Sequence, residues 1–260
     1  MKRAALILFA ALLAGCAGQP SQQSASELPV SQQAPTSDAQ NRAQKHAELG
    51  MLYYQVGNMG VALQEARVAA EADPNYAPAY NLLGLIHMSL RESGPAQADF
   101  ERAVRLAPGD PDIANNYGLF LCSNGREREA IQQFMQAVKN PLYKLPSRSY
   151  TNAGLCAMRM KDDKAAEDYF QRATRADGTN ATPLFNLADL AFRRGEYFIA
   201  RKYIAELHHL NEPDAESLWL ALRIERKLGD RQAEAGYSSQ LRRKFAGTPQ
   251  HQALMEGKYE

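Results

Sequence analysis

The sequence predicts an all-α fold, a solenoid of helix-turn-helix repeats, and three observations support that prediction. Gly50, Gly84 and Gly118 stand 34 residues apart. Similar words surround them, AELG, NLLG and NNYG, and TNAG follows at Gly154. No run of alternating apolar and polar residues indicates a strand. A period of this length is typical of arrays in which each unit buries its apolar face against the next unit.

The frame that these glycines set also fixes the places of other small and large residues. Small residues recur at positions 8, 20 and 27 of the frame, and large ones at positions 4, 7, 11 and 24. Small residues let two helices approach closely while large ones fill the gaps between them. This pattern resembles the tetratricopeptide (TPR) repeat, which implies a right-handed superhelix. The predicted repeats are about six, at residues 43–76, 77–110, 111–146, 147–180, 181–214 and 215–248, followed by a C-terminal tail.

Local signals predict where the helices begin and end. Asp110 followed by Pro111 suits a helix N-cap with proline in the first turn. Glycines at position 15 of four frames suit the turn inside each hairpin. The third frame is two residues longer, which indicates an insertion at Leu145 and Pro146. The sixth is the least regular because Leu222, Glu234 and Ser238 occupy its small, small and large positions, as is typical of a terminal repeat.

The first residues predict export and lipidation. Met1-Lys2-Arg3 is basic, Ala4–Leu13 is a short apolar core, and Leu13-Ala14-Gly15-Cys16 resembles the bacterial lipobox. We expect a signal peptide at residues 1–15 and lipidation of Cys16, with a plain secretory signal as the alternative. Residue 17 is alanine rather than aspartate, which for such lipoproteins favours the outer membrane. The expected location is therefore the outer membrane, lipid-anchored, with the repeats in the periplasm.

The next segment predicts a spacer. Residues 16–40 contain the lipidated cysteine and a stretch rich in Gln, Ser, Ala and Pro, in which Leu28 and Val30 are the only large aliphatic residues. Such a composition buries too little apolar surface to fold, so we expect a flexible tether before a TPR domain at residues 41–260.

Charge and motif content exclude several classes of function. The formal net charge is +1, which gives no electrostatic case for nucleic acid. Metal-binding, phosphate-binding and nucleophile motifs are absent, so we expect no metal site, no cofactor, no small-molecule substrate and no catalysis. Basic side chains gather late in the chain, and they indicate either a solvated face or a contact with an acidic partner or anionic lipid. They are Arg223, Arg226, Lys227, Arg231, Arg242, Arg243 and Lys244.

Cys122 and Cys156 fall on the first helices of repeats three and four, which should be neighbours. An exported protein folds in an oxidising compartment, so a disulfide between them is one expectation. Packed helix axes lie about 8–10 Å apart, which leaves two small apolar core residues as the alternative.

The inner face of the superhelix is the expected binding surface, formed by positions 2, 5, 9, 12 and 13 of each first helix. Its N-terminal end is apolar and rich in methionine, a residue that adapts to the shape of a partner. An extended or helical segment of a protein is therefore the expected ligand. The predicted contact residues are Met51, Tyr54, Gln55, Asn81, Leu85, Met88, Asn115 and Leu119.

The lipobox, the tether, the six repeats and the words NNYGLFLCSNGREREAIQQF and LRRKF with the tail after it resemble a known family. This is the family of type IV pilus biogenesis lipoproteins that includes PilF and PilW, the pilotins of the pilus secretin. The resemblance implies a protein that binds secretin subunits and promotes their outer-membrane localisation and multimerisation without catalysis. Two alternatives stay open: another outer-membrane TPR scaffold, in β-barrel assembly or in regulation of cell-wall synthesis, and a lipid-anchored enzyme.

Overall fold

The computed structural model describes residues 28–259, so the expected signal peptide, Cys16 and the first part of the tether lie outside it. The described residues form one 3-10 helix and α-helices α1 to α13, with no strand among them. The helices are η1 (Val30–Gln32), α1 (Asp38–Gln55), α2 (Met59–Ala72), α3 (Ala77–Ser89), α4 (Ser93–Leu106), α5 (Pro111–Ser123), α6 (Glu127–Val138), α7 (Pro146–Arg159), α8 (Asp163–Ala176), α9 (Ala181–Arg193), α10 (Tyr197–Leu210), α11 (Ala215–Leu228), α12 (Arg231–Lys244) and α13 (Pro249–Met255).

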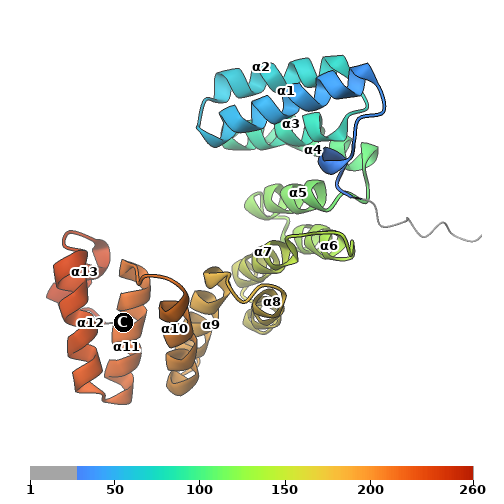
Figure 1. Cartoon of the computed structure of the whole chain (residues 1–260). Helices are drawn as coiled ribbons and strands as arrows, with labels where there is room; N and C mark the ends of the chain where they lie inside the picture. The colour runs from blue at the N-terminus through green and yellow to red at the C-terminus, as the bar shows by residue number, and fades with distance from the viewer. Residues whose placement is uncertain (1–27, 260) are drawn as a thin grey trace, which may run out of the picture.

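The first twelve α-helices pair into six successive hairpins that follow one another along a curved array (Figure 1). Each odd-numbered helix packs against the even-numbered helix after it, and each even-numbered helix also contacts the next hairpin. α1 lies at one end of the array and α13 at the other. The all-α TPR solenoid predicted from the 34-residue period is therefore confirmed.

Glycine at position 8 lets the two helices of a hairpin meet. A Cβ on Gly118 would stand 2.6 Å from the ring of Phe134, and one on Gly154 would stand 2.5 Å from the ring of Phe170. Both rings are completely buried. Repeat five fills the same space differently, because Ala188 takes the glycine position and Ile204 the aromatic one. The volume lost at one position is thus matched by volume gained at the other.

Position 15 of each repeat lies in the turn between the two helices and has a left-handed backbone. Gly57, Gly125, Gly195 and Gly229 have φ of 77–80° there. In repeats two and four the same conformation is held by Arg91 and Lys161, with φ of 62° and 59°. The turn geometry is thus set by the hairpin, and glycine lowers its conformational cost without being required.

Part of the segment predicted as a tether contacts the repeats in the structure, at Pro29 and Val30. Val30 lies in η1 against the cluster of Ala43 and Tyr76, and its backbone N–H donates to Asp110 Oδ2 at 2.7 Å. α1 begins at Asp38, capped by Ser37. The composition of this segment predicts a spacer because the residues that hold it lie elsewhere in the sequence. They are the apolar cluster with Tyr76 and the carboxylate of Asp110.

Two departures from the repeat pattern, the longer loop of repeat three and the large residue at position 8 of repeat six, are explained by packing. Tyr143, in the longer loop of repeat three, is buried against Ala114, and its hydroxyl oxygen lies 3.2 Å from Ser149 Oγ. In repeat six the oversized Leu222 lies in a cluster completed by Leu254 of α13. The tail therefore caps the last hairpin and accounts for its departure from the small-residue pattern.

Candidate partner-binding surface

The first helix keeps apolar residues at positions that later repeats bury. Leu49 and Leu52 occupy positions 7 and 10 of repeat one and are 40% and 60% exposed. The equivalent residues in repeats two to six are at most 8% exposed, because they face the hairpin before them. These residues are Leu83, Tyr117, Ala153, Leu187 and Ala221 at position 7, and Ile86, Phe120, Cys156, Leu190 and Ile224 at position 10.

Val56 extends this exposed face by one helical turn and is 76% exposed. Leu49 and Leu52 lie on one side of α1, and Val56, the C-cap residue of this helix, follows on the same side. We call these three residues the N-terminal end face. The outer face of a terminal repeat is normally polar. Clustered exposed apolar side chains instead mark an interaction site.

The predicted inner-face residues Met51 and Tyr54 lie on a different side of α1. Both are partly buried against the core that includes Leu82 and Ile86. The Tyr54 hydroxyl lies 3.0 Å from Ser89 Oγ of α3. Gln55 is exposed, and its place on the helix is between the inner face and the N-terminal end face.

The inner face continues onto the next two hairpins through Leu85, Met88 and Leu119. These three side chains are partly buried against the core around Phe120 and Cys122. The predicted apolar residues are therefore brought together as a strip along α1, α3 and α5, in which each side chain has one side in the core and one side accessible.

Asn81 and Asn115 were predicted to contact the partner, and the structure corrects this. Their side chains are only 7% and 1% exposed. Asn81 Oδ1 accepts from Asn116 Nδ2 at 3.2 Å, and Asn115 Oδ1 accepts from Ser149 Oγ at 2.9 Å and Asn152 Nδ2 at 3.0 Å. These amides join α3 to α5 and α5 to α7. Buried polar groups must be paired, so their role is to hold neighbouring repeats together.

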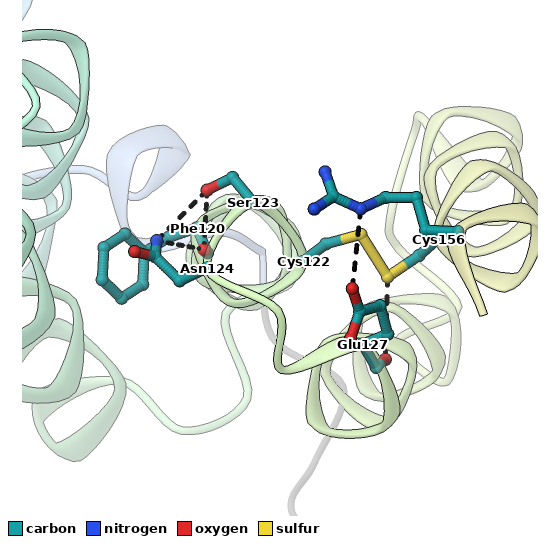
Figure 2. Close-up of a disulfide and its surroundings, with 7 residues drawn as sticks. Phe120, Cys122, Ser123, Asn124, Glu127 and Cys156 are labelled. Carbon is teal, nitrogen blue, oxygen red and sulfur yellow. Dashed lines mark hydrogen bonds and ion pairs between the residues drawn. A yellow bond between two sulfur atoms is a disulfide. The ribbon is translucent and has the colours of Figure 1, made fainter.

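Cys122 of α5 and Cys156 of α7 form a disulfide, with Cα atoms 6.0 Å apart (Figure 2). Position 10 faces the preceding repeat, which brings Cys156 against the end of α5. Beside the bridge, Arg159 Nε lies 3.5 Å from Glu127 Oε1. Of the two expectations for these cysteines, the structure contains the bridge, and it links repeats three and four covalently.

Within residues 28–259 no three His, Cys, Asp or Glu side chains gather closely enough to hold a metal ion. Over the same range no helix is both long and apolar enough to cross a bilayer. The candidate site is defined by exposed and half-buried apolar side chains: the N-terminal end face and the strip of Met51, Tyr54, Leu85, Met88 and Leu119.

Comparison with known proteins agrees with the repeat frames. The Tetratricopeptide repeat family matches residues 77–110 and 147–180, the predicted repeats two and four. The type IV pilus assembly protein PilF of Pseudomonas aeruginosa is 30% identical over 213 residues, which cover 82% of this chain and 84% of that protein.

Solved structures give the same result. A structure of Pseudomonas aeruginosa PilF matches with a TM-score of 0.77 and 29% identity, over 85% of this chain and 100% of that one. The crystal structure of PilW, described as a widely conserved type IV pilus biogenesis factor, matches with a TM-score of 0.74 and 26% identity, over 82% of this chain and 98% of the other. The chain therefore belongs to the PilF family of tetratricopeptide-repeat proteins.

Proposed function

We propose that this protein acts in type IV pilus biogenesis as a pilotin, a lipid-anchored outer-membrane protein that binds secretin subunits and promotes their localisation and multimerisation. Its relatives PilF and PilW are named for pilus assembly and biogenesis. The observation that supports binding on this chain is the N-terminal end face, where Leu49 and Leu52 are exposed at positions that bury an apolar side chain in repeats two to six, with Val56 exposed beside them. No bond is made or broken in this role.

The proposed contact uses two apolar areas, the N-terminal end face of repeat one and the strip along repeats one to three, which lie on different sides of α1. The N-terminal end face offers aliphatic side chains with no covering hairpin among the described residues. The strip of Met51, Tyr54, Leu85 and Met88 offers partly buried side chains that keep a fixed shape because their other sides lie in the core. An amphipathic segment of the partner would bury its apolar face on either area.

Lipidation at Cys16 provides the membrane location in this proposal. Acyl chains contribute about 0.8 kcal/mol per buried methylene, which is enough for several chains to hold a protein on a bilayer. Tethering the repeats at the outer membrane raises the concentration of the bound subunit at that surface. The disulfide supports an oxidising compartment such as the periplasm.

The experiment replaces Leu52 and Val56 by aspartate in one variant. Both side chains are exposed, so the fold should persist while apolar contact with the partner is lost. Losing two apolar anchors should reduce secretin pull-down and outer-membrane multimers by about tenfold or more. Phe198→Asp is the matched control, since Phe198 is 75% exposed on α10, far along the chain.

Two results would contradict the proposal. The first is equal multimers with the double variant and with Phe198→Asp, which would move the contact away from the N-terminal end face. The second is normal, correctly located multimers in cells without the gene, which would reject the pilotin role. Cys16→Ser tests the anchor separately: we expect subunit binding to persist and the membrane location to be lost.

A further inference from the structure

A second surface lies at the opposite end of the array from the N-terminal end face. It is a pocket of about 740 Å³ between α9, α10, α11 and the residues after α13. Arg193, Arg223, Arg226 and Lys227 line it together with the rings of Phe192 and Tyr259, and among residues 28–259 no acidic side chain lines it. Most of these side chains come from α9 and α11, the helices that form the inner face of repeats five and six.

The end of the chain forms one wall of this pocket. The ring of Tyr259 stacks on the indole of Trp219, with centroids 5.6 Å apart. The Tyr259 backbone carbonyl accepts from Arg223 Nε at 3.1 Å, and the Arg226 guanidinium lies 4.0 Å from the centre of the Tyr259 ring. The residues after α13 thus contribute Gly257 and Tyr259 to the pocket by lying back across α11.

Acidic neighbours balance only part of the positive charge. Arg193 pairs with Asp163 and Asp189, and Arg226 pairs with Glu234. Lys227 is exposed and has neither an ion pair nor a hydrogen bond from its side chain among residues 28–259.

Arg223 is also without an ion pair among the described residues, although it is partly buried. Its guanidinium lies 4.5 Å from the centre of the Phe192 ring. Burial lowers the pKa of Arg223, and the charge of Asp189 opposes that shift. A partly desolvated guanidinium with one carbonyl partner retains N–H groups for an anionic acceptor.

We infer that this pocket is a second binding site, one that takes a peptide segment bearing carboxylates next to an apolar or aromatic side chain. Arg223 and Lys227 supply charge-assisted donors to a carboxylate, and the faces of Phe192 and Tyr259 supply apolar contact beside them. A guanidinium matches the planar carboxylate in shape and charge. The site lies on the inner face, where an array of this kind holds extended segments, and it does not depend on the proposed secretin contact.

The protein carries its own probe for this site, because Trp219 is the single tryptophan of the chain and stacks on a ring that lines the pocket. The ligand probe is an N-acetylated, C-amidated octapeptide with three glutamates and two phenylalanines, and its control has glutamine for each glutamate. Titrated into the full chain, the glutamate peptide should change Trp219 fluorescence saturably. The glutamine peptide should bind about tenfold or more weakly because charge-assisted bonds are lost.

Variants then locate the binding. Lys227→Gln removes an exposed charge that has no structural partner, so it should weaken the glutamate peptide about threefold to tenfold without changing the fold. Lys164→Gln, an exposed lysine of α8, is the matched control and should leave the dissociation constant unchanged. Arg223→Gln should weaken binding further, and a urea unfolding curve shows whether that variant is folded when it is measured.

Three outcomes would overturn the inference. One is equal binding of the two peptides, and another is unchanged binding of the glutamate peptide in both Lys227→Gln and folded Arg223→Gln. The third is capture of phosphatidylglycerol vesicles through Lys227 without any binding of the glutamate peptide, which would make the surface a lipid contact. The Leu52 and Val56 aspartate variant should bind the peptide normally, so failure of this site and failure of the proposed function can be told apart.

Discussion

Val30 and Asp110 are joined by a hydrogen bond of 2.7 Å that spans 80 positions of the chain, from the backbone N–H of Val30 to Oδ2 of the carboxylate. The other oxygen, Oδ1, accepts from the backbone N–H groups of Asp112 and Ile113 and so caps α5. Burial raises the pKa of Asp110, and these hydrogen bonds oppose that shift. One side chain therefore both begins a helix and fixes the segment that precedes the repeats.

Replacement of Asp110 separates these two roles. Asp110→Ala loses the cap and should lower the free energy of unfolding by about 1–2 kcal/mol. Asp110→Asn keeps a capping oxygen, but an amide nitrogen that cannot accept takes the place of the oxygen bonded to Val30. Loss of that one hydrogen bond should lower the free energy of unfolding by about 1 kcal/mol or less. In both variants we expect faster proteolysis before Asp38, measured by limited digestion beside urea unfolding. Proteolysis at the wild-type rate in both would show that this bond does not hold the segment.

The disulfide should stabilise the middle of the array. Cys122 and Cys156 are 34 residues apart, and closing a loop of that length restricts the unfolded chain by about 3–4 kcal/mol. The double variant Cys122→Ala with Cys156→Ala should lose about that much in urea unfolding. Dithiothreitol should reduce the stability of the wild type and leave the variant unchanged. Equal stability of the two proteins without reductant would contradict the prediction.

The glycines at position 8 should tolerate no side chain. Gly118→Ala and Gly154→Ala place a Cβ within 2.6 Å of a buried ring, so each should cost about 1–3 kcal/mol by overpacking. Gly236→Ala is the control, because its Cβ would meet no atom within 4 Å in the middle of α12. That change should stabilise the protein by about 0.5–1 kcal/mol through helix propensity. Chemical denaturation measures all three, and a neutral Gly118→Ala would refute the packing argument.

His208 should make stability depend on pH. Burial lowers the pKa of His208 from 6.5, and the charge of Asp214 opposes that shift. Its Nε2 lies buried beside the Tyr237 ring, with no hydrogen-bond partner in the part of the chain that the structure describes. The neutral ring is therefore favoured in the folded state. The stability that the neutral ring contributes is fully present above the pKa of the unfolded state, which is about 6.5. It is lost as the pH falls from there through the lower pKa of the folded state.

Unfolding free energies at pH 7.5 and 5.5 test this. The decrease toward pH 5.5 should be smaller in His208→Phe than in the wild type, because phenylalanine keeps a ring against Tyr237 without a titrating group. His209→Gln, at the exposed neighbouring position, should keep the wild-type decrease. Identical pH dependence in His208→Phe and the wild type would exclude His208 as its source.

The repeat frame could be predicted from sequence because packing enforces it. Gly118 must be small since Phe134 lies against it. Each such pair places one small and one large residue at a fixed separation in the sequence, which the repeat pattern shows. The segment near Val30 has no recurring residue pattern, because its partners are distant in sequence. Asn115 was misplaced for a related reason: spacing identifies the inner side of a helix, but it cannot show that a neighbouring helix has already bonded the amide.

The candidate site was only partly predictable. The repeat positions of Met51 and Tyr54 predicted the inner face, whereas the N-terminal end face was missed because the residues at positions 7 and 10 are buried core in every other repeat. The available signal was that repeat one has no predicted hairpin before it, so Leu49 and Leu52 needed another partner. Positions 5, 9 and 12 of repeat six put Trp219, Arg223 and Arg226 on the inner face by the repeat rule, but only the structure shows Tyr259 lying back across them.

The Cys122–Cys156 bridge has a consequence for how the array opens. In a linear array each hairpin is stabilised mainly by its two neighbours, so unfolding begins at the ends and moves inward. A covalent link between hairpins three and four makes the centre the last part to separate. The two proposed binding surfaces then lie on the two parts that loosen first. A ligand on either should slow amide hydrogen exchange in its own half and leave the half beyond the bridge almost unchanged.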